Sequence, residues 1–224
     1  PLNLIQVQGY SATAAGAALL PFIVIMFALS RWAGRLVDRY GARIPLVAGP
    51  AIAAAGFALF AWPGVGGSYW VTFFPAVVVL GLGMAVTVAP LTTTVMNSIG
   101  EERAGIASGV NNAVSRTAAL LAIAVFGMIM AWAFDASLGR QLADLDAPPE
   151  VVDFLQGQRG KLAGASLPEN LDEGATRPLR LAVGMSYVTG FRWVMLLSAG
   201  LALLSALVAW RLIDGKPCPE KARR

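Results

Sequence analysis

The sequence predicts an all-α transmembrane protein with about five spanning helices. Of its 224 residues, 57% are apolar and 13% are charged, and the mean hydropathy is +0.65, whereas about a quarter of a soluble domain is charged. The apolar residues form blocks of about 20 residues, the length that crosses a hydrocarbon core of about 30 Å. Basic residues gather at the ends of these blocks, as membrane topology requires. Soluble enzymes and nucleic-acid binders are thereby largely excluded, and the net charge of +4 indicates no nucleic-acid partner.

Five apolar blocks define the expected helices. Ser11 is a plausible N-cap of the first and Pro21 a kink within it, and Pro90 breaks the third. The organisation is then four helices over residues 10–134, a loop over 135–190, a last helix over 191–210 and a basic tail over 211–224. The individual spans are Ala12–Ser30, Ile44–Ala61, Trp70–Met96, Gly105–Ala133 and Phe191–Trp210.

The charges on the short connections predict the orientation. Residues 31–43 hold four arginines and one aspartate, and the tail after Trp210 holds five basic and two acidic residues, so each carries +3. The turn over residues 63–68 carries no charge. Because positive connections stay in the cytoplasm, the first connection and the C-terminus are expected inside and the uncharged turn outside. Two further crossings place residues 97–104 inside, although this turn is net acidic.

Residues 135–190 differ in composition from the rest, with eight acidic against five basic residues up to Arg180. We expect an external loop with short helices around 138–145 and 149–156. A connection of this length is unusual and is often functional. It could form a cap over the external mouth or be a solvated spacer.

Covalent and metal chemistry are not expected. Histidine is absent and Cys218 is the single cysteine, which removes disulfides, zinc sites and thiol or histidine catalysis. The apolar blocks contain no Asp or Glu, so a carrier of coupled protons would have to lie outside this chain. We expect no cofactor and no metal. Residues 1–10 lack the basic start of a secretory leader.

The third block carries a polar face. Its members Gly83, Thr87, Pro90, Thr94 and Asn97 recur at spacings of four, three, four and three, which places them on one side of a helix. Such a face can line a water-filled path. Alternatively, it packs against a neighbouring helix while each threonine bonds to its own backbone.

On the fourth block Gly105, Gly109, Asn112 and Arg116 share a face. Arg116 lies about 16 Å from the start of the helix at about 1.5 Å per residue, close to the bilayer midplane. An arginine there costs at least about 2.5 kcal/mol, so it marks a functional site by default. It would hold an anionic substrate group or pair with a carboxylate on a moving helix; the alternative is a fixed bond to a backbone carbonyl or to Asn112. The predicted substrate path comprises Thr87, Pro90, Thr94, Asn97, Asn112 and Arg116.

The connection over residues 34–46, GRLVDRYGARIPL, is the sharpest motif. Two glycines would allow a tight turn between antiparallel helices, and Asp38 could accept from a helix N-terminus while pairing with an arginine. Anchoring by positive charge explains the arginines but not the aspartate or the glycine spacing. The motif residues singled out are Gly34, Asp38, Arg39, Gly41 and Arg43.

This motif resembles the cytoplasmic signature of the major facilitator superfamily, G-x-L-a-D-R-x-G-r-k-x-x-l, with Ala42 in place of the usual basic residue. Residues 9–21 and 107–116 resemble the fourteen-helix drug:proton antiporter branch, although Ala118 and Ala119 stand where glycines are common. The resemblance implies helices two to six of a C-terminal six-helix half, with residues 1–9 as the outer end of helix one. In that layout helices one and four line the cavity and helices two and five meet the other half.

The resemblance also implies the function. The expected activity is proton-coupled efflux of small amphipathic compounds across the inner membrane by alternating access. The partners would be the lipid bilayer, a small-molecule substrate and the N-terminal half of the same transporter. An uptake facilitator for a nutrient or metabolite and a non-transporting membrane component are the alternatives.

Overall fold

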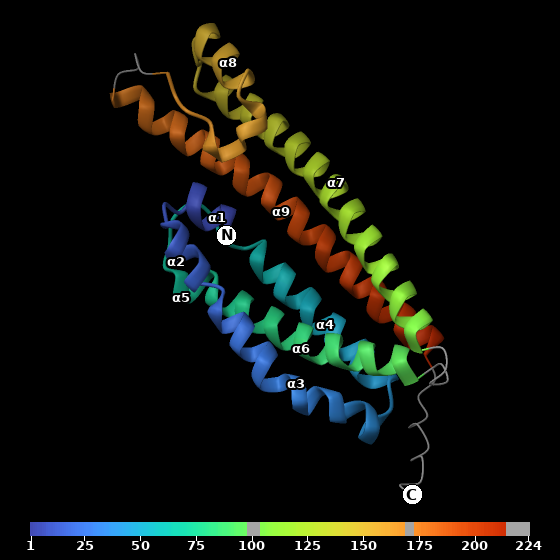
Figure 1. Ribbon diagram of the computed structural model, residues 1–224. Coiled ribbons are helices and arrows are strands. Elements are labelled where there is room, and N and C mark those ends of the chain that lie inside the picture. The colour runs from blue at the N-terminus through green and yellow to red at the C-terminus, as the bar shows by residue number, and fades with distance from the viewer. Residues whose placement is uncertain (98–103, 169–172, 214–224) are drawn as a thin grey trace, which may run out of the picture.

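Helices make up the regular structure of the described residues, which are 1–97, 104–168 and 173–213 of the computed structural model (Figure 1). Short helices stand at the ends of longer ones or between them. The short ones are α1 (Leu2–Gln6), α2 (Ala12–Ala17), α5 (Tyr69–Thr72), α8 (Pro149–Gln156) and the 3₁₀ helix η2 (Arg159–Gly164). The long ones are α3 (Leu20–Tyr40), α4 (Arg43–Phe60), α6 (Phe74–Asn97), α7 (Ala104–Asp144) and α9 (Glu173–Leu212).

Five helical segments in this part of the chain are long and apolar enough to cross a membrane. They are α2 with α3, then α4, α6, α7 and α9. This result confirms the predicted all-α fold class with five spans. The short break between α2 and α3 falls at residues 18–19, just before Pro21, and Ser11 caps α2 by accepting a hydrogen bond of 3.2 Å from the Ala14 amide.

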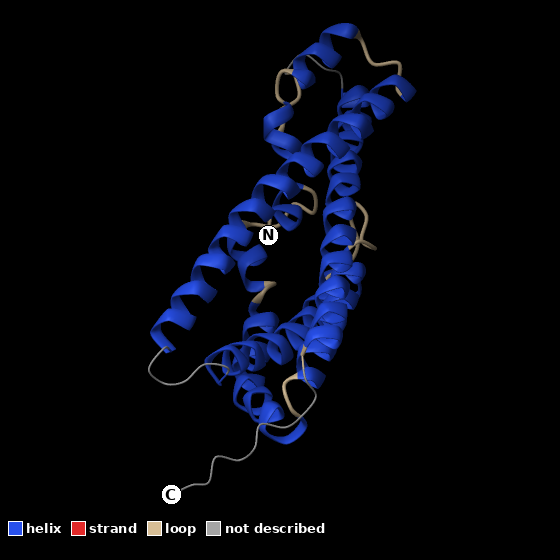
Figure 2. Ribbon diagram, turned by 90° about the vertical axis from the view of Figure 1, so that its right-hand side faces the viewer, coloured by secondary structure: helices blue, strands red, loops and turns tan. Residues whose placement is uncertain are grey.

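The long helices pack in a row. Helix α6 lies between α3 and α4, and α9 lies between α4 and α7, so that α7 occupies one edge (Figure 1). The turn from α3 to α4, the start of α7 and the end of α9 lie at one end of the bundle. The end of α7 and the start of α9 project from the opposite end together with α8 (Figures 1 and 2).

Glycines bring α4 and α6 into close contact. A Cβ atom added to Gly56 would lie 2.7 Å from the Leu80 nitrogen, and one added to Gly49 would lie 2.9 Å from the Thr87 nitrogen. A Cβ atom on Gly83 would collide with the backbone of Ala53. Small residues allow this approach because lipid supplies little hydrophobic drive between spans, and van der Waals contact between backbones replaces it.

The turn between α3 and α4 is shorter than the motif predicted. Helix α3 continues to Tyr40. Within this turn, Gly41 is the residue with a positive φ, with φ 76° and ψ 169°. Glycine is nearly the only residue found in this conformation. Gly34, which the sequence analysis placed in the turn, lies inside α3. The helix persists there because Ala33 and Val37, one turn apart, are both buried.

The structure differs from the expected loop over 135–190 at both of its boundaries. Helix α7 runs on to Asp144 and α9 begins at Glu173, so the connection without long helices is 145–172. Each of these helices is about 60 Å long at about 1.5 Å per residue, about twice the hydrocarbon core. Helix α8 coincides with the predicted helix over 149–156, and the one predicted around 138–145 is the last part of α7.

An apolar core holds the projecting segments together as a folded cap, which we define as residues 134–168 and 173–187. Its side chains recur every four residues on α7 and on α9, an amphipathic spacing that the surrounding charges concealed in the sequence. Helix α8 closes the core. The segment is therefore a folded unit and not a solvated spacer. The core residues are Phe134, Leu138, Leu142, Val151, Leu155, Leu179, Val183 and Tyr187.

The two motif glycines should respond oppositely to alanine. Gly41→Ala places a side chain at positive φ and should lower the free energy of unfolding by about 1–3 kcal/mol. Gly34→Ala meets nothing within 4 Å and should raise it by about 0.5–1 kcal/mol through helix propensity. Unfolding in detergent micelles followed by circular dichroism measures both variants; equal effects would contradict the assignment of the turn to Gly41.

The contact between α4 and α6 makes Gly83 intolerant of a side chain. Gly83→Val should cost about 1–3 kcal/mol, because the added atoms force the two backbones apart. Gly127→Val is the matched control, since this glycine also lies inside a spanning helix but faces open space. The same unfolding measurement compares them. Equal destabilisation by the two changes would show that helix propensity, not the contact, is responsible.

Candidate functional site

The polar face of α6 packs against α4 over much of its length. The Thr87 hydroxyl donates to the Gly83 carbonyl over 2.7 Å, and this side chain lies against Gly49 of α4. Pro90, one turn further on, is fully buried. A hydroxyl bonded to its own helix needs no water, so of the two interpretations of this face, helix packing describes Gly83, Thr87 and Pro90. Of these three, Thr87 and Pro90 belong to the predicted substrate path.

The end of α6 continues this pattern. Thr94 is half-buried, and its hydroxyl donates to the Pro90 carbonyl over 2.8 Å. Thr92 and Thr93 bond to carbonyls four residues earlier in the same way, each over 3.0 Å. The Asn97 side chain lies outside the described part of the structure. The threonines here therefore satisfy their hydrogen bonds within the helix.

Asn112 and Arg116 lie on an open surface of α7. Both side chains are exposed, and so is every residue from 112 to 121. Ala107 before this stretch is buried, and burial resumes at Ala133 and Phe134 where α7 meets α9. No hydrogen bond or ion pair joins Arg116 to another described residue, so the fixed bond to a carbonyl or to Asn112 is not formed.

This open surface is unlike the lipid-facing surface of an ordinary span. Asn112 and Arg116 are one helical turn apart, and Ser115 and Thr117 lie beside them. Amide and guanidinium groups in hydrocarbon without a partner cost several kcal/mol, on the order of 2.5 or more for the arginine. No described residue of the five spans forms a hydrogen bond or an ion pair with the Arg116 guanidinium.

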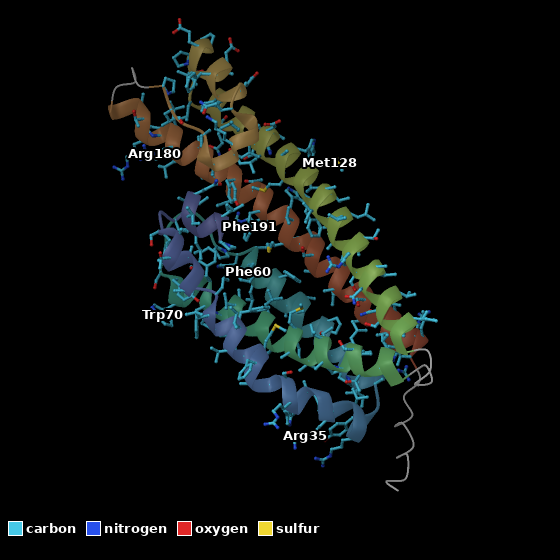
Figure 3. The ribbon with its side chains drawn as sticks, viewed as in Figure 1. Arg35, Phe60, Trp70, Met128, Arg180 and Phe191 are labelled. Atoms are coloured by element: carbon cyan, nitrogen blue, oxygen red, sulfur yellow. The ribbon has the colours of Figure 1, made fainter. Side chains whose placement is uncertain are left out.

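The motif over residues 34–46 brings basic and aromatic side chains together at one end of the bundle. The Arg39 guanidinium lies 5.4 Å from the Tyr40 ring centroid, and Arg35 points away from the bundle at the lower end of α3 (Figure 3). Arg43 starts α4 and lies 5.8 Å from the ring of Trp210, on which Arg211 also rests at 5.6 Å. These cation–π contacts join the start of α4 to the end of α9. The Asp38 side chain lies outside the described part.

Arg192 is a structural contact that the sequence analysis did not single out. Its Nη2 atom donates to the carbonyls of Trp62 and Pro63 over 3.3 and 3.5 Å, just past the end of α4. A cation is favourable at this negative end of a helix. The sequence did offer a signal for this residue, because Arg192 is the single charged residue between 191 and 210. Nearby, Gly190 admits Met130 of α7, whose sulfur would lie 2.7 Å from an added Cβ atom.

Comparison with known proteins extends these observations. The chain is 26% identical to the multidrug resistance protein Stp of Mycobacterium tuberculosis over 92% of its own length and 39% of Stp. It is 28% identical to a tetracycline resistance determinant of Streptomyces rimosus over 100% of its length and 69% of that protein. It is 26% identical to the tetracenomycin C resistance and export protein of Streptomyces glaucescens, over 91% and 38% of the two chains. The chain thus spans about two fifths of the length of Stp.

The family model of the Major Facilitator Superfamily matches residues 1–123, more than half of the sequence. The matched region contains the motif over residues 34–46 and α1 to α6, together with the exposed stretch of α7. This match confirms the resemblance seen in the motif, and it agrees with the all-helical fold and the five candidate spans. The chain belongs to the Major Facilitator Superfamily.

Proposed function

We propose that this chain is the C-terminal portion of a proton-coupled exporter of small amphipathic compounds in the bacterial inner membrane. Relatives named for multidrug resistance, tetracycline resistance and export of tetracenomycin C support the substrate class and the direction. The observation that carries the proposal is the exposed polar surface of α7 around Arg116. A spanning helix with this surface belongs against another part of a larger transporter.

The remainder of the transporter would supply the neighbour of α7. Alternating access rocks two halves about a site near the bilayer midplane, at the interface between them. Arg116 lies about 18 Å along α7 at about 1.5 Å per residue, which is near that depth. Asn112 and Arg116 would then border the substrate path and change their surroundings as the halves move. Thr87 and Pro90 would instead keep α6 fixed to α4.

Proton coupling would depend on the other half. The five apolar blocks carry no Asp, Glu or His, and these are the groups whose charge changes most readily near neutral pH when their surroundings change. On this chain, Arg116 contributes a guanidinium group to the exposed surface of α7. The guanidinium would respond to a carboxylate on the facing half, releasing it when a proton arrives and pairing with it again when the proton leaves.

We also propose that the motif end of the bundle faces the cytoplasm. Asp38 and Arg39 would take part in the contacts that close the transporter on this side. The basic residues of the α3–α4 turn and Arg211 of α9 meet at this end, in agreement with the positive-inside rule.

The orientation predicts the labelling of two positions. Cys218 is the single native cysteine, and in spheroplasts an impermeant maleimide should modify it only after the membrane is permeabilised. Ser68 is exposed in the turn before α5, so Ser68→Cys in a Cys218→Ser background should be modified without permeabilisation. The reverse order of accessibility would show that the chain is inserted with the opposite orientation.

Arg116 is the residue on which the efflux proposal depends most. In the complete transporter, Arg116→Ala should reduce the rate of drug efflux from preloaded cells at least about tenfold, since the charge that faces the other half is lost. Collapse of the proton gradient should reduce the rate of the unchanged protein to the same level. Expression and detergent-extracted yield should be unaltered, because Arg116 packs against no described residue.

Leu120→Ala is the matched control, since Leu120 lies one turn further along the same exposed surface. It should leave the efflux rate within about twofold of the unchanged protein, in line with other surface substitutions. Unaltered efflux in Arg116→Ala would remove this residue from the mechanism. Accumulation of the compound instead of its loss would indicate uptake, and no flux in either direction would indicate a non-transporting component.

A further inference from the structure

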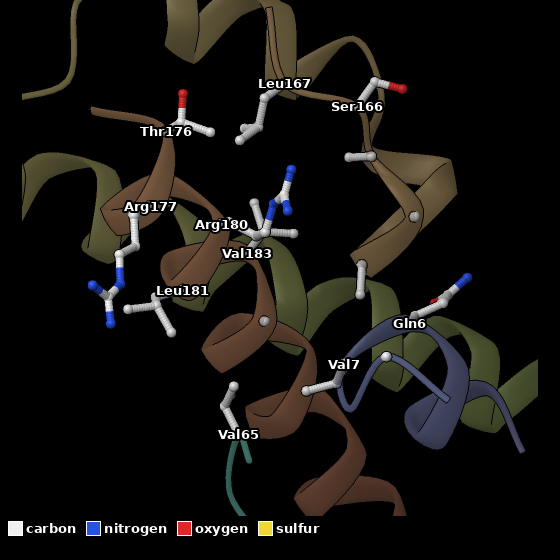
Figure 4. Close-up of a pocket in the computed structure, with 15 residues that line it drawn as sticks. Gln6, Val7, Val65, Ser166, Leu167, Thr176, Arg177, Arg180, Leu181 and Val183 are labelled. Atoms are coloured by element: carbon white, nitrogen blue, oxygen red, sulfur yellow. The ribbon is translucent and has the colours of Figure 1, made fainter. Parts of the chain in front are cut away.

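A cavity of about 870 Å³ lies where the cap meets the rest of the bundle (Figure 4). Four segments line it: α1, the turn over residues 62–68, η2 with the chain that follows it, and the first turns of α9. Cavities of about 300–1,000 Å³ bind small molecules when a few polar groups stand among apolar walls. This cavity is at the opposite end of the bundle from the start of α7, so it is separate from the proposed path at Arg116.

One wall is braced by the side chain of Gln8. Its Nε2 atom donates to the Gly64 carbonyl over 2.8 Å, while its Oε1 atom accepts from the Gly66 amide over 2.9 Å. These two bonds fix the turn over 62–68 against α1 and hold Val65 at the floor of the cavity. A Cβ atom on Gly184 would lie 3.5 Å from Val65 Cγ2, so the floor is closely packed.

The opposite wall is braced in the same manner by Gln158. Its Nε2 atom donates to the Ser166 carbonyl over 3.1 Å, and its Oε1 atom accepts from the Ser166 amide over 3.2 Å. Lys161 Nζ donates to the same Oε1 atom over 2.9 Å. Residues 158–166 thus form a closed strap whose shape does not depend on a ligand. Both walls are therefore preorganised, which lowers the entropic cost of binding.

Two arginines supply the charge in the cavity. Arg180 extends its guanidinium between the strap and α9, toward Leu167, whereas the guanidinium of Arg177 turns away (Figure 4). No carboxylate is among the described residues that line the cavity, and no described residue hydrogen-bonds or ion-pairs with Arg180. A guanidinium in this position can bind a carboxylate or sulfonate with two parallel hydrogen bonds.

The rest of the lining is mainly apolar. Val7 and Val65 form the floor, and Leu181 and Val183 of α9 also line the cavity. These groups would cover an apolar body next to the charged head, and each Å² of apolar surface removed from water contributes about 25 cal/mol. We infer that this cavity binds an organic anion that has one carboxylate or sulfonate group and a compact apolar body, with Arg180 as the residue that selects the charge.

The test uses the full 224-residue chain in nanodiscs of zwitterionic lipid, with 2-naphthalenesulfonate as the probe. Isothermal titration calorimetry should give saturable binding with one site per chain. 2-Naphthol, which keeps the apolar body without the charge, should bind about fivefold more weakly, the value expected for an ion pair that remains partly exposed. Equal affinity for the two probes would overturn the inference, as would titrations indistinguishable from those of empty nanodiscs.

Substitution at Arg180 separates recognition of the charge from non-specific apolar binding. Arg180→Gln should weaken binding of 2-naphthalenesulfonate about fivefold and leave binding of 2-naphthol unchanged, since only the ion pair is lost. Arg180→Lys should retain part of the affinity, because the charge remains while the planar fork is lost. The circular dichroism spectrum of each variant should match that of the unchanged chain, since the Arg180 side chain is exposed.

Arg140→Gln is the matched control. Arg140 is also an exposed arginine on the cap, where its Nε atom donates to the Ala136 carbonyl over 3.0 Å, but it does not line the cavity. This change should leave both affinities unaltered. Equal weakening by Arg140→Gln and Arg180→Gln would show that the probe senses only the net charge of the cap, and an unchanged affinity in Arg180→Gln would exclude Arg180 as the selective residue.

Discussion

Hydrocarbon offers no hydrogen bonds, and this constraint governs where polar side chains occur in the spans. Hydroxyl groups meet it within their own helices: Thr87, Thr94 and Ser198 each donate to a carbonyl four residues earlier. Backbones approach closely at Gly49, Gly56 and Gly83 of α4 and α6. Arg116 does not follow the pattern, because its guanidinium has no described partner. That exception is the reason for the proposal that α7 carries the functional surface.

The cap is stabilised differently from the spans. Its apolar side chains can be removed from water, so the hydrophobic effect acts on its core in the ordinary way. The spacing of four between Leu179, Val183 and Tyr187 gives α9 one continuous apolar stripe there. Between the spans, close packing of small residues and direct interhelical contacts stabilise the bundle instead of the hydrophobic effect. Helices α7 and α9 each continue from the bundle into the cap, over a length of about 60 Å at about 1.5 Å per residue.

Contacts between distant segments tie the bundle together near both ends. Arg192 of α9 bonds to carbonyls after α4, and Trp210 of α9 lies beside Arg43 at the start of α4. Helices α3, α6, α4 and α9 thereby form a packed block, while the first part of α7 stands exposed at its edge (Figure 1). Under the proposed function, this block would move as a unit, and α7 would provide the surface on which the two halves slide.

Blocks of apolar residues and the motif around Gly41 are local properties of the chain, so the fold class, the five spans and the family follow from the amino-acid sequence alone. The surroundings of the described polar residues, in contrast, depend on how the helices pack. Thr87 and Arg116 look equally suited to a substrate path in the sequence, yet Thr87 lies against Gly49 and Arg116 does not meet another described helix. The extension of α7 and α9 into the cap was also not evident in the sequence. Phe134 and Leu179 are far apart in the chain, and the helices that carry them are stabilised there because the two segments bury each other.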